Sequence, residues 1–149
     1  MCLCGRRTAR RRCAECARKS TRHETAVRDA LEADHRLRGF VWDARAAVGR
    51  CTRRPDFLWT FERSCVALEV DENEHASYDP EDERARVEEI ERALGRPVSW
   101  VRVRVAPGAS REDTEAAVVD AADVIADVVF SARKKTGGSK IKNVTIAVK

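Results

Sequence analysis

The sequence predicts an α/β fold, because segments with apolar residues at helical spacing alternate with segments typical of strands. The strongest strand signal lies in residues 56–71, where aromatic and aliphatic residues dominate two runs separated by a charged turn. A second strand signal is residues 98–105, where valines alternate with Trp and Arg. With 149 residues, the chain is long enough for one domain with its own core.

The remaining elements follow from apolar periodicity and from Gly and Pro. In chain order we expect a helix over 22–37, a weaker strand over 40–48, the hairpin, a helix over 81–94, a strand over 98–105 and one long helix over 112–130. Gly39 and Gly95 end the first two helices, and Asp79-Pro80 opens the second. Residues 144–148 could add an edge strand inside a basic tail. The expected organisation is a cysteine-rich segment over 1–20, the main domain over 21–131 and the tail over 132–149.

Three carboxylates are expected to gather at one end of the hairpin. A turn centred between Glu62 and Arg63 pairs Phe57 with Leu68, and Asp56 with Glu69. Alternation then places Phe57, Trp59, Phe61, Val66, Leu68 and Val70 on a core face, and Asp56, Leu58, Cys65, Ala67, Glu69 and Asp71 on the other. Crowded acids are costly unless a cation neutralises them. The spacing alone fits a metal site and an ordinary solvent face about equally well.

Charge is distributed unevenly along the chain. Residues 1–22 carry eight Arg or Lys against one acid, and residues 132–149 carry six against none, whereas the middle holds fifteen basic and twenty-four acidic residues. Two basic ends around an acidic body indicate a polyanionic partner such as nucleic acid, or simply tails that keep the protein in solution. No apolar run is long enough for a signal peptide or a membrane span, so we expect an intracellular protein, in cytoplasm or nucleus, that does not bind membranes.

Four of the six cysteines lie in two short motifs, C-x-C at Cys2 and Cys4 and C-x-x-C at Cys13 and Cys16. Inside a cell these thiols stay reduced, and the segment is too short and polar to fold on its own core. Zn²⁺ would supply the missing folding energy. We therefore expect a zinc knuckle, with His23 as a substitute ligand; unstructured thiols are the alternative.

Several motifs in the middle of the chain occur together in one family. They are Arg53-Arg54-Pro55-Asp56-Phe57-Leu58, Glu69-Val70-Asp71-Glu72-Asn73-Glu74-His75, Ser77-Tyr78-Asp79, Glu83 with Arg86, and Leu94-Gly95-Arg96-Pro97-Val98. With these motifs the chain resembles the P-D…(D/E)-x-K nuclease superfamily over residues 23–106. It is more similar to the nuclease-like proteins of large DNA viruses and algae, and more distantly to the very-short-patch repair endonucleases. The resemblance implies a restriction-endonuclease-like core, with a mixed central sheet flanked by helices, and a zinc segment before it; it also allows a viral origin.

The resemblance implies a metal-dependent endonuclease that hydrolyses DNA, in repair or in the processing of mobile-element or viral DNA. Asp56 and Glu69 would hold Mg²⁺ or Mn²⁺ together with the Val70 carbonyl, and Glu24 is similar to the first-helix glutamate that completes the site in many members. Hard carboxylate oxygens suit Mg²⁺, which activates water and neutralises charge on the phosphate. His75 resembles the histidines of the short-patch repair enzymes and could be a general acid or base, or an ordinary loop residue.

The sequence departs from the superfamily pattern at the lysine. Asp71 stands at that position; it cannot orient an anionic phosphate as lysine does, but it could ligate a second metal or accept a proton from the attacking water. Arg86 could take over the phosphate contact, or could only pair with Glu83 on its own helix. Arg53, Arg54 and Arg86 are the expected nucleic-acid contacts.

Three functions therefore stay open at this stage. The first is a Mg²⁺-dependent deoxyribonuclease, which the combination of acids and His75 favours. The second is a DNA-binding protein with the nuclease fold but no catalysis, which the absent lysine favours. The third is a protein whose acids bind a structural ion only.

Overall fold

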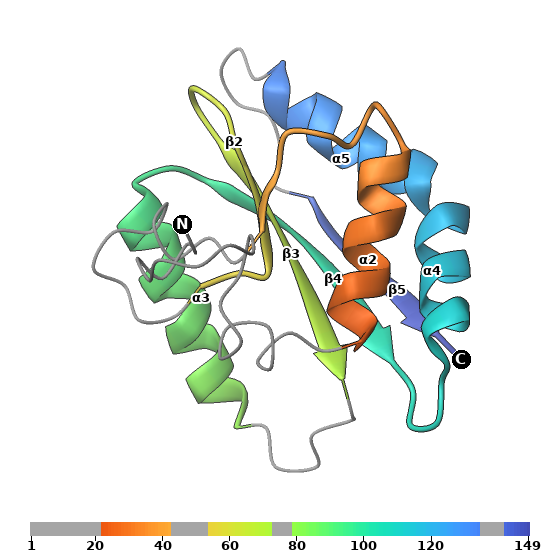
Figure 1. Ribbon diagram of the computed structural model, residues 1–149. Helices are drawn as coiled ribbons and strands as arrows, with labels where there is room; N and C mark the ends of the chain where they lie inside the picture. The colour runs from red at the N-terminus through yellow and green to blue at the C-terminus, as the bar shows by residue number, and fades with distance from the viewer. Residues whose placement is uncertain (1–21, 43–53, 73–78, 135–141) are drawn as a thin grey trace, which may run out of the picture.

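The computed structural model describes residues 22–42, 54–72, 79–134 and 142–149. They form a five-stranded mixed sheet with helices on both faces (Figure 1). The helices are α2 (Arg22–Ala33), α3 (Pro80–Leu94), α4 (Arg111–Asp120) and α5 (Ala122–Arg133), and the strands are β1 (Val41–Trp42), β2 (Phe57–Thr60), β3 (Cys65–Glu72), β4 (Val98–Val105) and β5 (Asn143–Val148). The predicted α/β class and mixed sheet are confirmed. None of the helices in these described ranges is long and apolar enough to cross a membrane.

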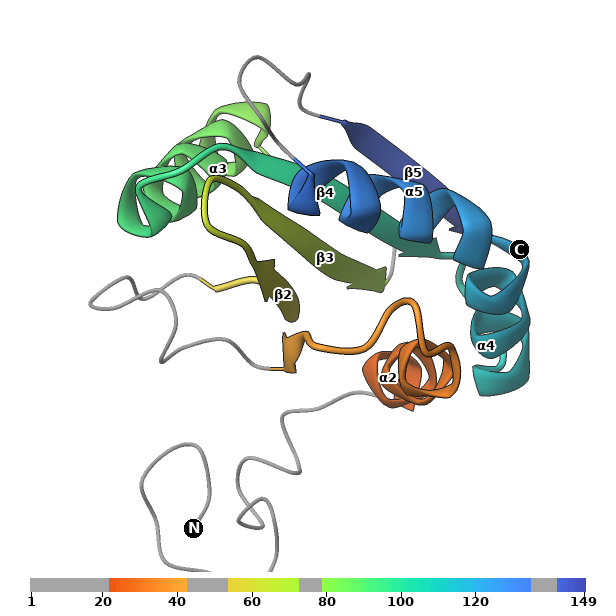
Figure 2. The same cartoon turned by 90° about the horizontal axis from the view of Figure 1, so that it is seen from above.

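The sheet has the order β1-β2-β3-β4-β5. The pairs β1-β2 and β2-β3 are antiparallel, whereas β3-β4 and β4-β5 are parallel. Parallel neighbours need a crossover connection, and α3 supplies it between β3 and β4, while α4 and α5 lie between β4 and β5. The edge strand considered for residues 144–148 is present as β5. Figure 2 shows the consequence: α3 lies on one side of the sheet, and α2, α4 and α5 lie on the other.

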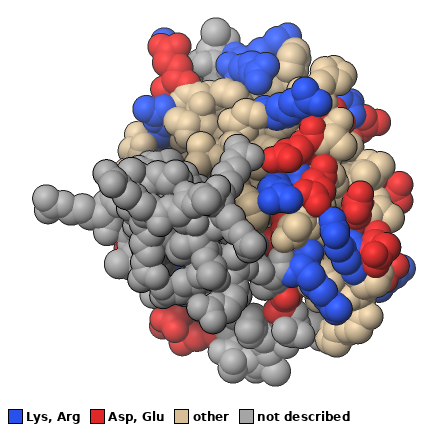
Figure 3. Space-filling model, viewed as in Figure 1, with Lys and Arg blue, Asp and Glu red and all other residues tan. Residues whose placement is uncertain are grey.

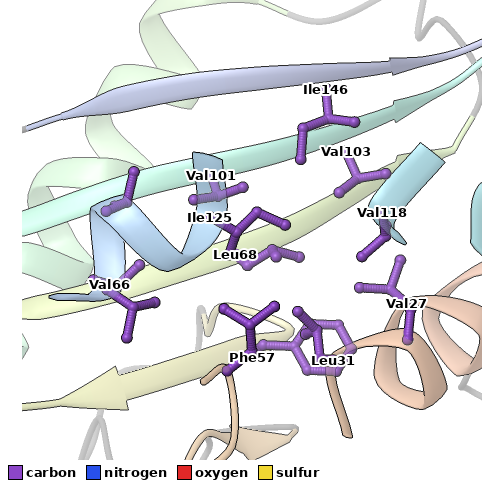
Figure 4. Close-up of a cluster of buried hydrophobic side chains, with 14 of the residues drawn as sticks. Val27, Leu31, Phe57, Val66, Leu68, Val101, Val103, Val118, Ile125 and Ile146 are labelled. Atoms are coloured by element: carbon purple, nitrogen blue, oxygen red, sulfur yellow. The ribbon is translucent and has the colours of Figure 1, made fainter. Parts of the chain in front are cut away.

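The predicted hairpin register is confirmed. Phe57 pairs with Leu68 and Trp59 with Val66. Phe61 N–H donates to the Ser64 carbonyl at 2.9 Å and closes the turn. The core face of the hairpin packs under α2, α4 and α5 in the main cluster, which includes Val27, Leu31, Phe57, Val66, Leu68, Val101, Val103, Val118, Ile125 and Ile146 (Figure 4).

The opposite face of the hairpin differs from the expectation of a charged face. Leu58, Cys65 and Ala67 are fully buried there, in a second apolar cluster with Ile90 of α3 and Trp100 of β4. The reason is the parallel pairing of β3 with β4, because the connecting helix covers this face. The acids therefore emerge at the border of a packed layer, which raises the cost of leaving them unneutralised.

Two helix boundaries are confirmed and one expectation is wrong. The Asp79 carboxylate accepts from Glu81 N–H at 2.9 Å at the start of α3, and Gly95 ends it with φ 65°. The single helix expected over 112–130 is instead two helices that meet at Ala121, with φ −89° and ψ 2°. Ala121 N–H still donates to the Ala117 carbonyl at 3.1 Å and Ile125 N–H to the Ala121 carbonyl at 3.0 Å. These two backbone hydrogen bonds span the bend, and neither Gly nor Pro marks it in the sequence.

The first helix is shorter than expected, and the first strand lies only partly within the described residues. Helix α2 ends at Ala33, and Leu37 N–H donates to the Asp34 carbonyl at 3.0 Å in the turn that follows. The strand expected over 40–48 is present at Val41–Trp42; it does not include Phe40, and residues 43–48 lie outside the described residues.

Candidate functional site

Acidic and basic side chains meet at the carboxyl end of β3, on the face that α3 covers. Glu69 and Asp71 alternate with Val70 along β3, so both point to that face. The parallel register places Arg102 of β4 directly beside Glu69. Because α3 returns from the end of β3 to the start of β4, its first two turns bring Glu83 and Arg86 to the same place.

Asp56 precedes β2 and is fixed by the neighbouring strand. Its Oδ2 accepts from Val70 N–H at 2.8 Å. Burial raises the pKa of Asp56 to about 7, and the nearby Glu24 and Glu69 carboxylates add to the rise. The Val70 hydrogen bond and the charge of Arg86 oppose it. At neutral pH the pKa of Asp56 is about equal to the pH of the solution, so Asp56 is protonated in about half of the molecules.

Glu69 is held by an arginine fork. Arg86 Nη1 donates to Glu69 Oε2 at 2.5 Å, and Arg86 Nη2 donates to Oε1. The Glu69 side chain is 4% exposed and that of Arg86 is 21% exposed. Burial raises the pKa of Glu69, and the Arg86 hydrogen bonds and charge pull the pKa down. Arg102 Nη1 lies farther away, at 3.7 Å from Oε2. Both Glu69 oxygens are thus committed to Arg86.

A second arginine joins the other acids. Arg102 Nη2 donates to Glu83 Oε1, and its Nη1 lies 3.6 Å from Asp71 Oδ2. Arg86 Nη1 lies 3.8 Å from Glu83 Oε1. Glu83 Oε2 is buried and has no hydrogen-bond partner among the described residues. The result is a continuous cluster in which two guanidinium groups face Glu69, Asp71 and Glu83.

Most residues predicted from the sequence meet in or beside this cluster. Arg54 takes part through its backbone, because its carbonyl accepts from Arg86 Nη2 at 3.3 Å. Arg102 was missed. Its signal was present in the strand over 98–105, where Arg102 lies on the side away from the valines, but its place beside Glu69 required the parallel pairing of two strands. His75, Arg53, Cys2, Cys4, Cys13 and Cys16 lie outside the described residues.

His23, the substitute zinc ligand, is engaged within the domain. It is 5% exposed, and its Nδ1 lies 2.8 Å from Thr114 Oγ1 on α4. Arg22 Nε donates to its Nε2 at 3.2 Å. Both ring nitrogens therefore have partners, and the histidine joins α2 to α4.

The donor atoms suit a hard divalent cation in type but not in arrangement. Carboxylate and carbonyl oxygens are what Mg²⁺ and Mn²⁺ prefer. Within the part of the chain that the structure describes, no three His, Cys, Asp or Glu side chains are placed to hold one ion. The fork from Arg86 explains this for Glu69. A cation shared by Asp56 and Glu69 would require Glu69 to leave Arg86.

The surface seen in Figure 3 carries basic and acidic side chains interspersed among the described residues. Ion pairs between described side chains include Arg28 with Asp29 at 2.6 Å, Arg111 with Asp29 at 2.7 Å, and Arg36 with Asp123 at 2.8 Å.

Comparison with known proteins found no matching family model, no similar curated protein and no similar solved structure. Fold and site together define an α/β protein with an arginine-bridged carboxylate cluster at the end of its central parallel strand pair.

Proposed function

We propose that this protein is a divalent-metal-dependent endonuclease that hydrolyses DNA phosphodiester bonds. The observation that supports it most is the electrostatic environment of Asp56. Carboxylates of Glu24 from α2 and of Glu69 from β3 lie close enough to raise the pKa of Asp56, in a place where burial already makes a negative charge costly. Groups with such strongly shifted pKa values are characteristic of functional sites.

Each residue has a proposed role that suits its chemistry. Asp56 and Glu69, with the Val70 carbonyl, would hold Mg²⁺ or Mn²⁺, and Glu24 would complete the site. The cation would supply Lewis acidity and a water of lowered pKa. Asp71, at the rim of the cluster, would accept a proton from the attacking water or contact a second cation.

Further residues would bind or assist the nucleic acid. Arg86, Arg54 and Arg53 would contact phosphate groups, and His75 would act as general acid or base. The basic ends of the chain would add sequence-independent attraction to DNA, which is the only macromolecular partner that we propose. The same proposal includes a zinc knuckle formed by Cys2, Cys4, Cys13 and Cys16. It also places the protein in the cytoplasm or nucleus, where DNA is found, with a part in repair or in viral or mobile-element processing.

The test is cleavage of supercoiled plasmid and of mismatched duplex with Mg²⁺ or Mn²⁺. Wild type is compared with Glu69→Gln on β3 and with Glu88→Gln, a control at an exposed position on helix α3. We expect metal-dependent cutting by wild type and Glu88→Gln that is lost in Glu69→Gln. Equal cutting by all three proteins would indicate a contaminating nuclease and remove the support for this function.

A second candidate is a nucleic-acid-binding protein without catalysis. The bidentate pair of Glu69 with Arg86 favours it, because a carboxylate that is saturated by arginine does not need a metal, and the lysine of the resembled superfamily is replaced by Asp71. Under this function, duplex DNA binds to wild type with the same affinity with and without a chelator, and no substrate is cut.

A further inference from the structure

The Arg86 side chain contacts both segments of the candidate site at once. Its guanidinium forks onto Glu69 of β3 and also donates to the carbonyl of Arg54, two residues before Asp56. A single side chain thereby closes the gap between the segment that carries Asp56 and the strand that carries Glu69. Any ligand shared by Asp56 and Glu69 has to compete with it.

The two arginines of the cluster are held differently. Arg102 lies within ion-pair distance of Glu69, Asp71 and Glu83, so it would keep two acidic partners if Glu69 moved away. Arg86 makes close contacts with Glu69 and with the Arg54 carbonyl, and its distance to Glu83 is 3.8 Å. Arg86 is therefore the exchangeable member of the cluster, and Arg102 is the fixed one.

Glu69 has little alternative to a cation once Arg86 leaves. Its side chain is 4% exposed, so water gives it little solvation, and the remaining arginine is 3.7 Å away and shared with two other acids. A buried carboxylate that loses its partner is strongly destabilised unless another positive charge replaces it. Asp56, close enough to raise the cost further, would share that replacement.

We propose that Arg86 and a divalent cation compete for Glu69, and that a phosphate group of nucleic acid favours the cation by drawing Arg86 onto itself. The guanidinium fork matches phosphate in the same bidentate way as it matches carboxylate. The Arg86 side chain is 21% exposed, so a phosphate can reach it, whereas Glu69 is closed to solvent. The site would then be complete only while nucleic acid is bound. This inference rests on the proposed metal site and adds how that site is controlled.

The coupling has a measurable consequence. If phosphate and cation favour the same arrangement, each tightens the binding of the other by the same factor, because coupling free energies are reciprocal. A ligand shifts such an equilibrium only through its different affinity for the two arrangements. Removing Arg86 should abolish the coupling and leave tight cation binding.

The experiment measures free Mn²⁺ by electron paramagnetic resonance, which reports binding directly even if the DNA is cut. Full-length wild type, Arg86→Gln and the exposed-helix control Arg84→Gln are titrated with and without a short duplex, and the duplex alone is titrated in parallel. We expect wild type and Arg84→Gln to bind Mn²⁺ about tenfold more tightly with duplex. We expect Arg86→Gln to bind Mn²⁺ without duplex as tightly as wild type does with it. Asp56→Asn should lose this binding, which locates the ion.

The outcomes separate the two claims. Mn²⁺ binding that depends on Asp56 but is equally tight in wild type and Arg86→Gln, with no effect of duplex, would refute the competition and leave the metal site standing. No binding that depends on Asp56, in any of the proteins, would refute both the competition and the proposed function. If Arg86→Gln does not fold, Arg86→Lys takes its place; it keeps the charge but cannot form the fork, and any tightening of Mn²⁺ binding without duplex supports the competition, whereas unchanged binding refutes it.

Discussion

Replacing Asp56 with Asn should stabilise the metal-free protein at pH 8. Asn keeps the size of Asp and an oxygen that can accept from Val70 N–H, but it has no charge to bury. The pKa of Asp56 is raised from 3.8 to about 7, so ionisation in the folded state costs roughly 4 kcal/mol at most. Local relaxation and water entry reduce this, and we expect about 2 kcal/mol.

The direction of the pH dependence follows from proton binding. Between pH 3.8 and about 7 the folded state retains a proton on Asp56 that the unfolded state has lost, so wild-type stability falls as pH rises through this window. The penalty is absent below the window and complete above it. The Asp56→Asn variant lacks it, and the difference in stability between variant and wild type therefore grows in favour of the variant from pH 4 to pH 8.

Urea unfolding in the presence of a chelator, at several pH values in this range, measures this difference. Asp127→Asn, an exposed position on α5, is the matched control and should show no such trend. If Asp56→Asn is less stable than wild type by a constant amount at every pH, Asp56 is ionised without penalty in the fold and the reasoning is wrong. Addition of Mg²⁺ at pH 8 should raise the stability of wild type and leave Asp56→Asn unchanged.

Three further substitutions test the packing and the helix ends by urea unfolding. Trp59→Phe should lower the free energy of unfolding by about 2 kcal/mol, because Trp59 Nε1 donates to the buried Leu37 carbonyl at 2.8 Å. A decrease of less than about 0.5 kcal/mol would mean that water replaces this hydrogen bond. Ser110→Ala should cost about 1 kcal/mol by removing the reciprocal cap with Asp113, and a neutral effect would show that the cap contributes nothing. Gly95→Ala should cost about 1 kcal/mol at φ 65°, and a gain in stability would contradict the left-handed end of α3.

The hairpin could be predicted from the sequence because its pairing is local. A slip of one residue would move Phe57 and Trp59 off the core face, so the aromatic pattern allows one register only. The caps of α3 were predictable for the same reason, since Asp79 and Gly95 act on the backbone next to them. The bend at Ala121 was not, because neither Gly nor Pro marks it and apolar residues continue at helical spacing through it.

In the site too, the contacts that are local in sequence could be predicted and the distant ones could not. Asp56 and Glu69 were predicted together because one turn brings them together, whereas the contacts of Arg86 and Arg102 depend on a helix and a strand that are distant in sequence. Alternation could show that Arg102 lies opposite the valines, but not that β4 lies parallel to β3 in the register that pairs Arg102 with Glu69. The sequence thus indicated where acids gather and left their neutralisation undetermined.

How each acid is neutralised bears on the role of any bound ion. Burial and the neighbouring carboxylates favour the protonated form of Asp56, Arg86 neutralises Glu69, and Arg102 neutralises Glu83. The protein can therefore fold without metal at this site, because Asp56 has a raised pKa and Arg86 pairs with Glu69. If an ion served only to stabilise the fold, the free energy of ion binding would be part of the free energy of folding. Without the ion, the negative charges of its ligands would then have no other partner. Under the proposed function, an ion at this site would therefore bind after folding, in exchange for a proton and an arginine.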